Sequence, residues 1–141
     1  MFAFNFLTLD ELDKLKSEPC TILLYCRQKY DKRERDAICD RFVASQCRCL
    51  TFVGTDSGLW EVALDEADMR NNPDKDECWA LTIAKEKLTK ETIGIWSSCS
   101  VDSPNEIKVA YVIGDTDKSM RKLICKILKK NCYLLFILLD N

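Results

Sequence analysis

A chain of 141 residues, 47% of them hydrophobic and 31% charged, has the size of one ordinary globular domain with its own core. The formal net charge of -2 excludes the strong overall basic field of proteins that bind nucleic acid mainly through its phosphates. The longest apolar run, CYLLFILL at 132–139, is too short to cross a bilayer as a helix. We therefore expect a single domain spanning residues 1–141, with no membrane partner.

The N-terminus and the cysteines indicate the compartment. The first residues are apolar but have no basic leader and no small-residue cleavage site, so the sequence predicts no export. The nine cysteines are odd in number, and most lie inside apolar periodic segments, which is untypical of a disulfide framework. We expect reduced cysteines in a cytoplasmic protein.

The first elements are a short helix and a buried strand. Thr8 and Glu11 have the spacing of a capping box, and leucines recur every three residues behind them. This pattern predicts an N-terminal helical extension within residues 1–18. CTILLYC at 20–26 is continuously apolar, which is typical of a strand covered on both faces in a parallel sheet.

The next three segments alternate between helix and strand. We expect a helix at 31–46, a strand at 48–54 and a second helix at 58–70. For the second helix, the apolar spacing predicts a buried stripe formed by Leu59, Val62, Ala63 and Ala67.

Residues 78–100 are compatible with a hairpin of two strands or with a strand followed by a helix. We favour strand then helix, because Thr89 suits an N-cap and Leu88 has the hydrophobic-staple spacing to Ile93.

Beyond a turn at 102–106, the sequence predicts a strand at 107–114, a strongly amphipathic helix at 117–130 and a last strand at 132–139. The whole order predicts an open three-layer α/β/α domain. Its sheet would be mostly parallel and five-stranded, with a flavodoxin-like or Rossmann-like strand order. Periodicity alone leaves the strand order open.

Polar residues follow the predicted strands, where ligands bind in open parallel sheets. Asp56, Asp115 and Asp117 have oxygen atoms suited to Mg²⁺. The competing interpretation is that Asp117 or Thr116 caps the helix that follows, and that Asp115 stabilises the turn.

The same strand ends contain side chains suited to a phosphate or other small ligand. We select Lys29, Ser57, Lys85 and Thr116 as candidate ligand-binding residues. GTDSG at 54–58 lacks both the dinucleotide-binding and the P-loop patterns, so a tight turn with an Asp56 or Ser57 cap is the alternative.

The chain contains no histidine, the commonest general base, which argues against an enzyme. Cys26 precedes Arg27, a setting that lowers a thiol pKa, although an edge or packed thiol is the interpretation we favour. Five cysteines stand at strand starts, where a thiolate zinc site competes with simple packing: Cys20, Cys47, Cys49, Cys78 and Cys132. Cys47 and Cys49 are two residues apart on a strand, so we expect them to point to the same face.

Charge is segregated along the chain. Residues 118–130 are basic and contain no acid, whereas the second predicted helix contributes Glu61, Asp65, Glu66 and Asp68. Opposite patches of this kind steer protein partners, although solvated helix faces look the same. No aromatic platform accompanies the basic helix, so we do not expect nucleic-acid binding.

Two functions therefore remain. We favour a non-enzymatic protein-interaction module without a cofactor, such as an immunity-type or regulatory component of a bacterial defence or toxin system. The alternative is a small Mg²⁺-dependent phosphoryl-transfer or nucleotide-processing enzyme with its site at the strand ends. Homo-oligomerisation is compatible with both.

The segments CRCLTFVGTDSGLWEVALDEADM and DECWALTIAKEKLTKETIGIW resemble the middle of an uncharacterised bacterial family of small single-domain α/β proteins. The resemblance implies a strand followed by a helix at 78–99 and a bacterial cytoplasmic setting. It implies no activity and no site residue.

Overall fold

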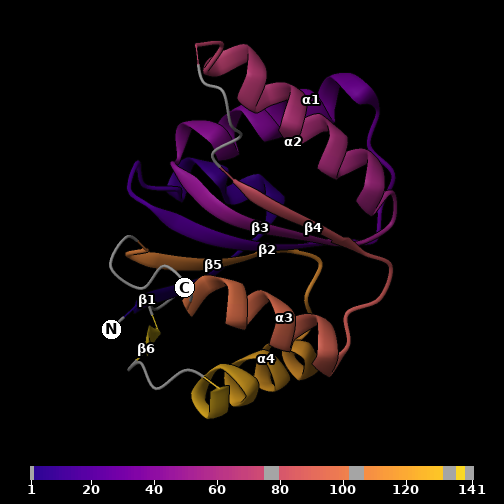
Figure 1. Ribbon diagram of the computed structural model, residues 1–141. Coiled ribbons are helices and arrows are strands. Elements are labelled where there is room, and N and C mark those ends of the chain that lie inside the picture. Colours follow the sequence, from indigo (N-terminus) through magenta and orange to yellow (C-terminus); the bar gives the residue numbers. More distant parts are fainter. Residues whose placement is uncertain (1, 75–79, 102–106, 132–135, 139–141) are drawn as a thin grey trace.

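The computed structural model describes residues 2–74, 80–101, 107–131 and 136–138 (Figure 1). Strands and helices alternate through these ranges. In chain order they are β1 (Phe2–Leu7), the short 3-10 helix η1 (Leu9–Lys14), β2 (Cys20–Cys26), α1 (Lys32–Ala44), β3 (Cys47–Gly54), α2 (Ser57–Asn71), β4 (Leu81–Lys85), α3 (Lys90–Val101), β5 (Val109–Gly114), α4 (Lys118–Asn131) and β6 (Phe136–Leu138).

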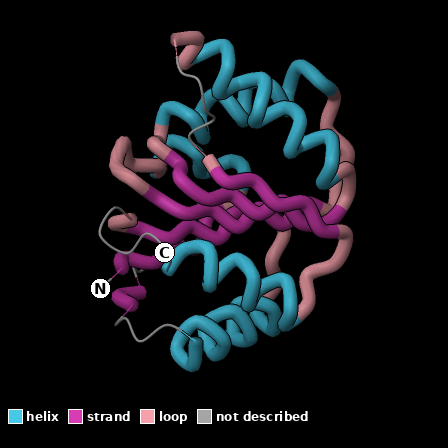
Figure 2. The backbone as a smooth tube through the Cα atoms, viewed as in Figure 1, coloured by secondary structure: helices cyan, strands magenta, loops and turns pink. Residues whose placement is uncertain are grey.

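The strands form one parallel sheet in the order β4-β3-β2-β5-β1-β6, and helices cover both of its faces. Figure 2 shows α1 and α2 on one side of the sheet and α3 and α4 on the other. This arrangement confirms the predicted open three-layer α/β fold. Counted from β2, the order β4-β3-β2-β5 is that of the Rossmann-like half-sheet, with its reversal point between β2 and β5.

The N-terminus differs from the prediction, because residues 2–7 form a strand inside the sheet. The β1 strand pairs with β5 on one side and with β6 on the other, so the sheet has six strands and not five. Phe4 and Phe6 alternate with Asn5 and are buried against the α3–α4 layer, as period-two side chains of a strand must be. Of the predicted N-terminal helical extension, the structure contains the short helix η1, which follows β1.

Local sequence signals explain how the helices begin. Thr8 and Glu11 form the predicted capping box of η1, and Asp31 and Glu34 form another at α1. Thr89 accepts a hydrogen bond from the Thr92 backbone N–H at 3.1 Å, which confirms strand then helix at 78–99.

The core has two halves, one on each face of the sheet. Trp60 stacks against Phe52 under α2 with 6.0 Å between ring centroids. On the other face, buried Trp96 of α3 donates to Thr21 Oγ1 at 2.9 Å. The predicted turn at 102–106 and most of the predicted last strand lie outside the described residues, whereas β6 falls within that strand.

Candidate functional site

The carboxyl ends of β2 and β5 flank the point where the strand order reverses, which is where ligands bind in such sheets. In this protein, the loop after β5 is hydrogen-bonded to the end of β2 at this point. The Asp115 carboxylate accepts the Arg27 backbone N–H at 2.7 Å, and the Asp115 N–H donates to Tyr25 O at 2.8 Å. Asp115 therefore fastens the loop after β5 to the end of β2.

Its neighbours also have structural roles. Asp117 caps α4 by accepting the Met120 N–H at 2.8 Å, and Thr116 Oγ1 accepts from Arg121 Nε at 3.2 Å. These contacts agree with the capping interpretation of the sequence. Within the part of the chain that the structure describes, no three acidic or cysteine side chains are grouped to hold a metal ion, and this includes Asp56, Asp115 and Asp117.

The loop after β3 closes onto the same strand end. The Thr55 N–H donates to Cys26 O at 2.8 Å, and Thr55 Oγ1 donates to Arg27 O at 3.1 Å. Asp56 occupies the N-cap position of α2 in the left-handed conformation, with φ 57° and no side-chain capping bond. Ser57 is buried.

The candidate ligand-binding residues do not converge. Lys29 is exposed in the loop after β2, and Lys85 ends β4, which is separated from β5 by β3 and β2. Ser57 is buried, and Thr116 is held by Arg121. The structure therefore brings no phosphate-binding group together from these four residues.

The surroundings of the Cys26 thiol differ from the reactive setting that its sequence neighbours indicate. Burial raises the pKa of its thiol, and the charges of Asp115 and Asp56 raise it further. The thiol donates to Gln28 O at 3.1 Å. It is a packed thiol, in agreement with the favoured interpretation.

The outer face of α2 exposes large apolar side chains. Among the described residues, the exposed large apolar side chains are Leu59 (50%), Val62 (52%) and Met69 (68%) on α2 and Leu81 (55%) on β4. The first three follow the helical repeat along one side of α2. We call these four residues, with Glu61, Asp65 and Glu66 beside them, the α2–β4 surface.

The predicted buried stripe of α2 was partly wrong. The helix buries Trp60, Ala63, Leu64 and Ala67, which have the i, i+3, i+4, i+7 spacing, and exposes Leu59 and Val62. Because Trp60 is the largest apolar residue of the segment, centring the stripe on it would have given the correct face.

The acidic residues of α2 divide between surface and interior. Glu61, Asp65 and Glu66 are at least partly exposed, and Glu66 lies 3.5 Å from Lys32 Nζ. Burial and the nearby charge of Asp68 raise the pKa of Asp65. Asp68 does not suit the partner-binding role predicted for it. Its side chain is only 5% exposed and faces inward, where it accepts a hydrogen bond from the Asn72 side-chain amide at 2.8 Å.

The cysteines at the strand starts are also arranged differently from the prediction. A bulge in β3 pairs Cys20 with Cys47 and Thr21 with Cys49, leaving Arg48 between them. Cys47 consequently packs on the α1–α2 face and Cys49 on the α3–α4 face, so the prediction of a shared face was wrong. Cys78 and Cys132 lie outside the described residues.

Fold and site together define a three-layer α/β domain of Rossmann-like strand order, with the loops after β3 and β5 hydrogen-bonded to the end of β2 and large apolar side chains exposed on α2 and β4. The chain belongs to a family known as a domain of unknown function, DUF7684, whose model matches residues 3–131. This agrees with the resemblance to an uncharacterised family. No curated protein matches the chain, and neither does any solved structure. Among the described residues, no helix is long and apolar enough to cross a membrane.

Proposed function

We propose that this protein is a non-enzymatic interaction module that binds another protein through the α2–β4 surface. The single observation that carries the proposal is the gathering of the exposed large apolar side chains, among the residues described, on one helix and the neighbouring edge strand. An apolar surface bordered by polar residues is the usual form of a protein-binding site.

The edge of the sheet extends this surface. The β4 strand pairs with β3 alone, so its other edge offers backbone N–H and C=O groups to a partner. Figure 1 shows α2 lying over β3 and β4, so this helix is a neighbour of that edge of the sheet. A partner segment on β4 would therefore also reach the α2 side chains.

The charges define the chemistry of the partner. Glu61 and Asp65 lie beside the apolar row, and no cation is paired with either carboxylate in the ion pairs of the described residues. We infer that the partner presents apolar side chains bordered by lysine or arginine, as a regulatory or immunity-type complex requires for fast, selective association.

The experiment compares capture of partners from the native host by matched surface variants. Val62→Arg and Glu61→Lys change the α2–β4 surface without disturbing the core, and Lys126→Glu changes an exposed residue of α4 on the opposite layer. We expect a protein that binds the wild type and Lys126→Glu at low salt, and that both α2 variants lose. Retention of every captured protein by Val62→Arg, or no capture at all, would overturn the proposal.

A purified-protein measurement distinguishes self-association from a second protein. Sedimentation of the wild type and of Val62→Arg across a concentration series reports whether copies of this chain occupy the surface. A concentration-dependent dimer that Val62→Arg abolishes would identify the partner as a second copy.

A further inference from the structure

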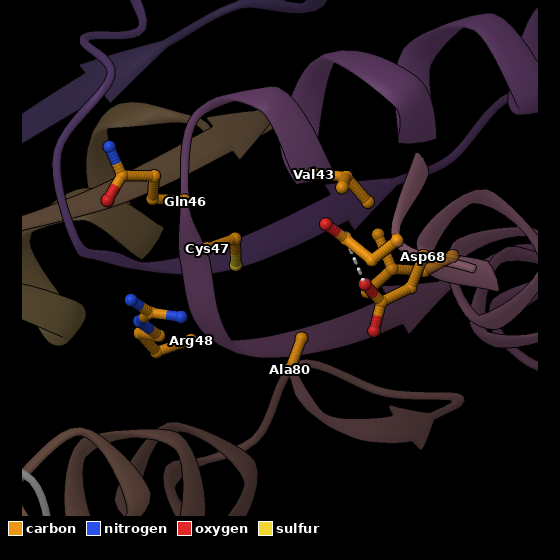
Figure 3. Close-up of a pocket in the computed structure, with 8 residues that line it drawn as sticks. Val43, Gln46, Cys47, Arg48, Asp68 and Ala80 are labelled. Carbon is orange, nitrogen blue, oxygen red and sulfur yellow. Dashed lines mark hydrogen bonds between the residues drawn. The ribbon is translucent and has the colours of Figure 1, made fainter. Parts of the chain in front are cut away.

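A cavity of about 220 Å³ opens where α1 ends, β3 begins and α2 passes over them. Its walls are formed by Val43, Gln46, Cys47, Arg48, Leu64, Asp68, Asn72 and Ala80. Figure 3 shows the Cys47 sulfur directed into the space between Val43, Arg48, Asp68 and Ala80. The space is large enough for several water molecules, so a small polar molecule can reach that sulfur.

Cys47 has a second thiol beside it. Cys20 is its register partner on β2, and both side chains pack on the same face of the sheet. The two thiols influence each other's pKa, while the Cys47 thiol donates to Cys49 O at 3.3 Å and the Cys20 thiol donates to Ser45 O at 3.7 Å. Neighbouring strands lie about 4.8 Å apart, within the Cα separation that a disulfide bridges. The strand spacing therefore places the two residues within the range that a disulfide can span.

The connection between α1 and β3 fixes this pairing. Gln46 adopts a left-handed conformation with φ 64°. Its backbone carbonyl accepts the Cys20 N–H at 3.2 Å, and its side-chain amide donates to Ser17 O at 3.1 Å. The first residue of β3 is thus tied to the first residue of β2. The thiol pair is held by the backbone and not by side-chain packing alone.

The surroundings make Cys20 the more acidic thiol of the pair. Its interaction with Cys47 lowers the pKa of Cys20, against the effect of burial and of the Glu18 charge, and hydrogen bonding by Ser45 and the charge of Arg48 lower it further. Burial raises the pKa of Cys47. By contrast, burial raises the pKa of Cys39 to about 12, and burial also raises the pKa of Cys125.

We propose that Cys20 and Cys47 are a redox-active thiol pair, which a small hydroperoxide entering through the cavity oxidises to an intramolecular disulfide. The Cys47 sulfur attacks the terminal peroxide oxygen, the O–O bond breaks, and the Cys47 proton leaves with the displaced oxygen as an alcohol, or as water when the peroxide is hydrogen peroxide. Cys20 then attacks the sulfur of the Cys47 sulfenic acid, and its proton leaves with the displaced oxygen as water. The two sulfur atoms are oxidised and the peroxide is reduced.

The test is peptide mapping of the full chain after treatment with hydrogen peroxide and alkylation of the remaining thiols. Arg48 separates Cys47 from Cys49, so trypsin places them on different peptides, and fragmentation separates Cys20 from Cys26. We expect a peptide that links Cys20 to Cys47 and has lost two hydrogen atoms. Absence of this peptide from the oxidised wild type would overturn the proposal.

Cys49→Ser is the matched control, because Cys49 lies on the same strand but on the opposite face of the sheet. The linked peptide is expected in Cys49→Ser and lost in Cys47→Ser. Should Cys47→Ser fail to fold, alkylation of the wild type decides the question, with the folded protein incubated with or without peroxide and then unfolded for labelling. Loss of labelling restricted to Cys20 and Cys47 supports the pair, whereas equal loss at Cys125 shows unselective oxidation and contradicts it.

Discussion

Two glycines let the loops after β3 and β5 approach the end of β2 more closely than a side chain would allow. A Cβ atom at Gly114 would lie 2.0 Å from Tyr25 O, and one at Gly54 would lie 2.3 Å from Cys26 O. Both residues also have positive φ, 116° at Gly114 and 102° at Gly54. Close approach and backbone conformation therefore require glycine at the same two positions.

We expect Gly114→Ala to lower the free energy of unfolding by about 3 kcal/mol, because the new methyl group meets backbone and the residue is strained at positive φ. Urea denaturation measures the loss. Gly58→Ala is the control, since nothing lies within 4 Å of a Cβ placed there. In exposed helix it should gain about 0.5–1 kcal/mol. Equal effects of the two variants would contradict the close approach.

Asp117 distinguishes a helix cap from a metal ligand. Asn is as good a cap as Asp but a poorer ligand for Mg²⁺, so we expect Asp117→Asn to keep wild-type stability and Asp117→Ala to lose about 1 kcal/mol. Thermal unfolding of the three proteins with and without millimolar Mg²⁺ is the measurement. A Mg²⁺-induced stabilisation that Asp117→Asn removes would favour the metal-dependent alternative.

At the scale of elements, η1 shows how a capping box responds to pH. The hydrogen bond from Lys14, followed by that from the Thr8 backbone, lowers the pKa of Glu11 from 4.5 to about 2. The folded-state pKa is depressed, so the stability that Glu11 contributes is present above about pH 4.5 and is lost as the pH falls toward 2.

We therefore expect Glu11→Gln to be less stable than the wild type at neutral pH, with a difference that vanishes near pH 2. Denaturation at a series of pH values measures it. Because the carboxylate is exposed, added salt should reduce the difference at neutral pH. A difference independent of pH would show that Glu11 does not act through its charge.

At the scale of the whole molecule, β1 is a structural part of the sheet and not an appendage. The β1 strand covers the edge of β5 and supplies the only neighbour of β6 among the described residues. Arg121 of α4 lies 4.8 Å from the centroid of the Phe6 ring, which adds a contact between β1 and the helical layer.

We expect a chain that begins at Thr8 to lose β6 from the sheet and to aggregate through the exposed edge of β5. Hydrogen exchange should show lost protection in β5, with the central strands β2 and β3 the last to exchange, and light scattering should show association. A monomeric truncated protein with an unchanged thermal midpoint would contradict the central position of β1.

Much of the fold could be predicted from the sequence, because its strongest patterns are local. Uniform apolar runs predicted β2 and β5, helical spacing predicted α1, and helical spacing with a cap predicted α4. The β1 strand was missed because FAFNFL is short and has its pairing partner about a hundred residues away. No local pattern records the bulge at Arg48 either, since it results from the tight connection after Gln46.

Less of the candidate site could be predicted. The strand-end aspartates were found by topology, but their backbone partners at Arg27 and Met120 are set by loop conformation. On α2 the sequence predicted the acidic residues as one group, whereas a shift in the buried stripe separates partly exposed Asp65 and exposed Glu66 from buried Asp68. Surface position on a helix depends on its rotation, and packing of Trp60 sets that rotation.

The position of β1 also affects the order of events during synthesis. This strand is synthesised before the other strands of the sheet, yet β5, on which it pairs, begins only at Val109. Until then Phe4 and Phe6 have no sheet to cover them, while β2, α1 and β3 can already assemble with one another. A chaperone that recognises short aromatic segments would find its binding site at this end of the nascent chain.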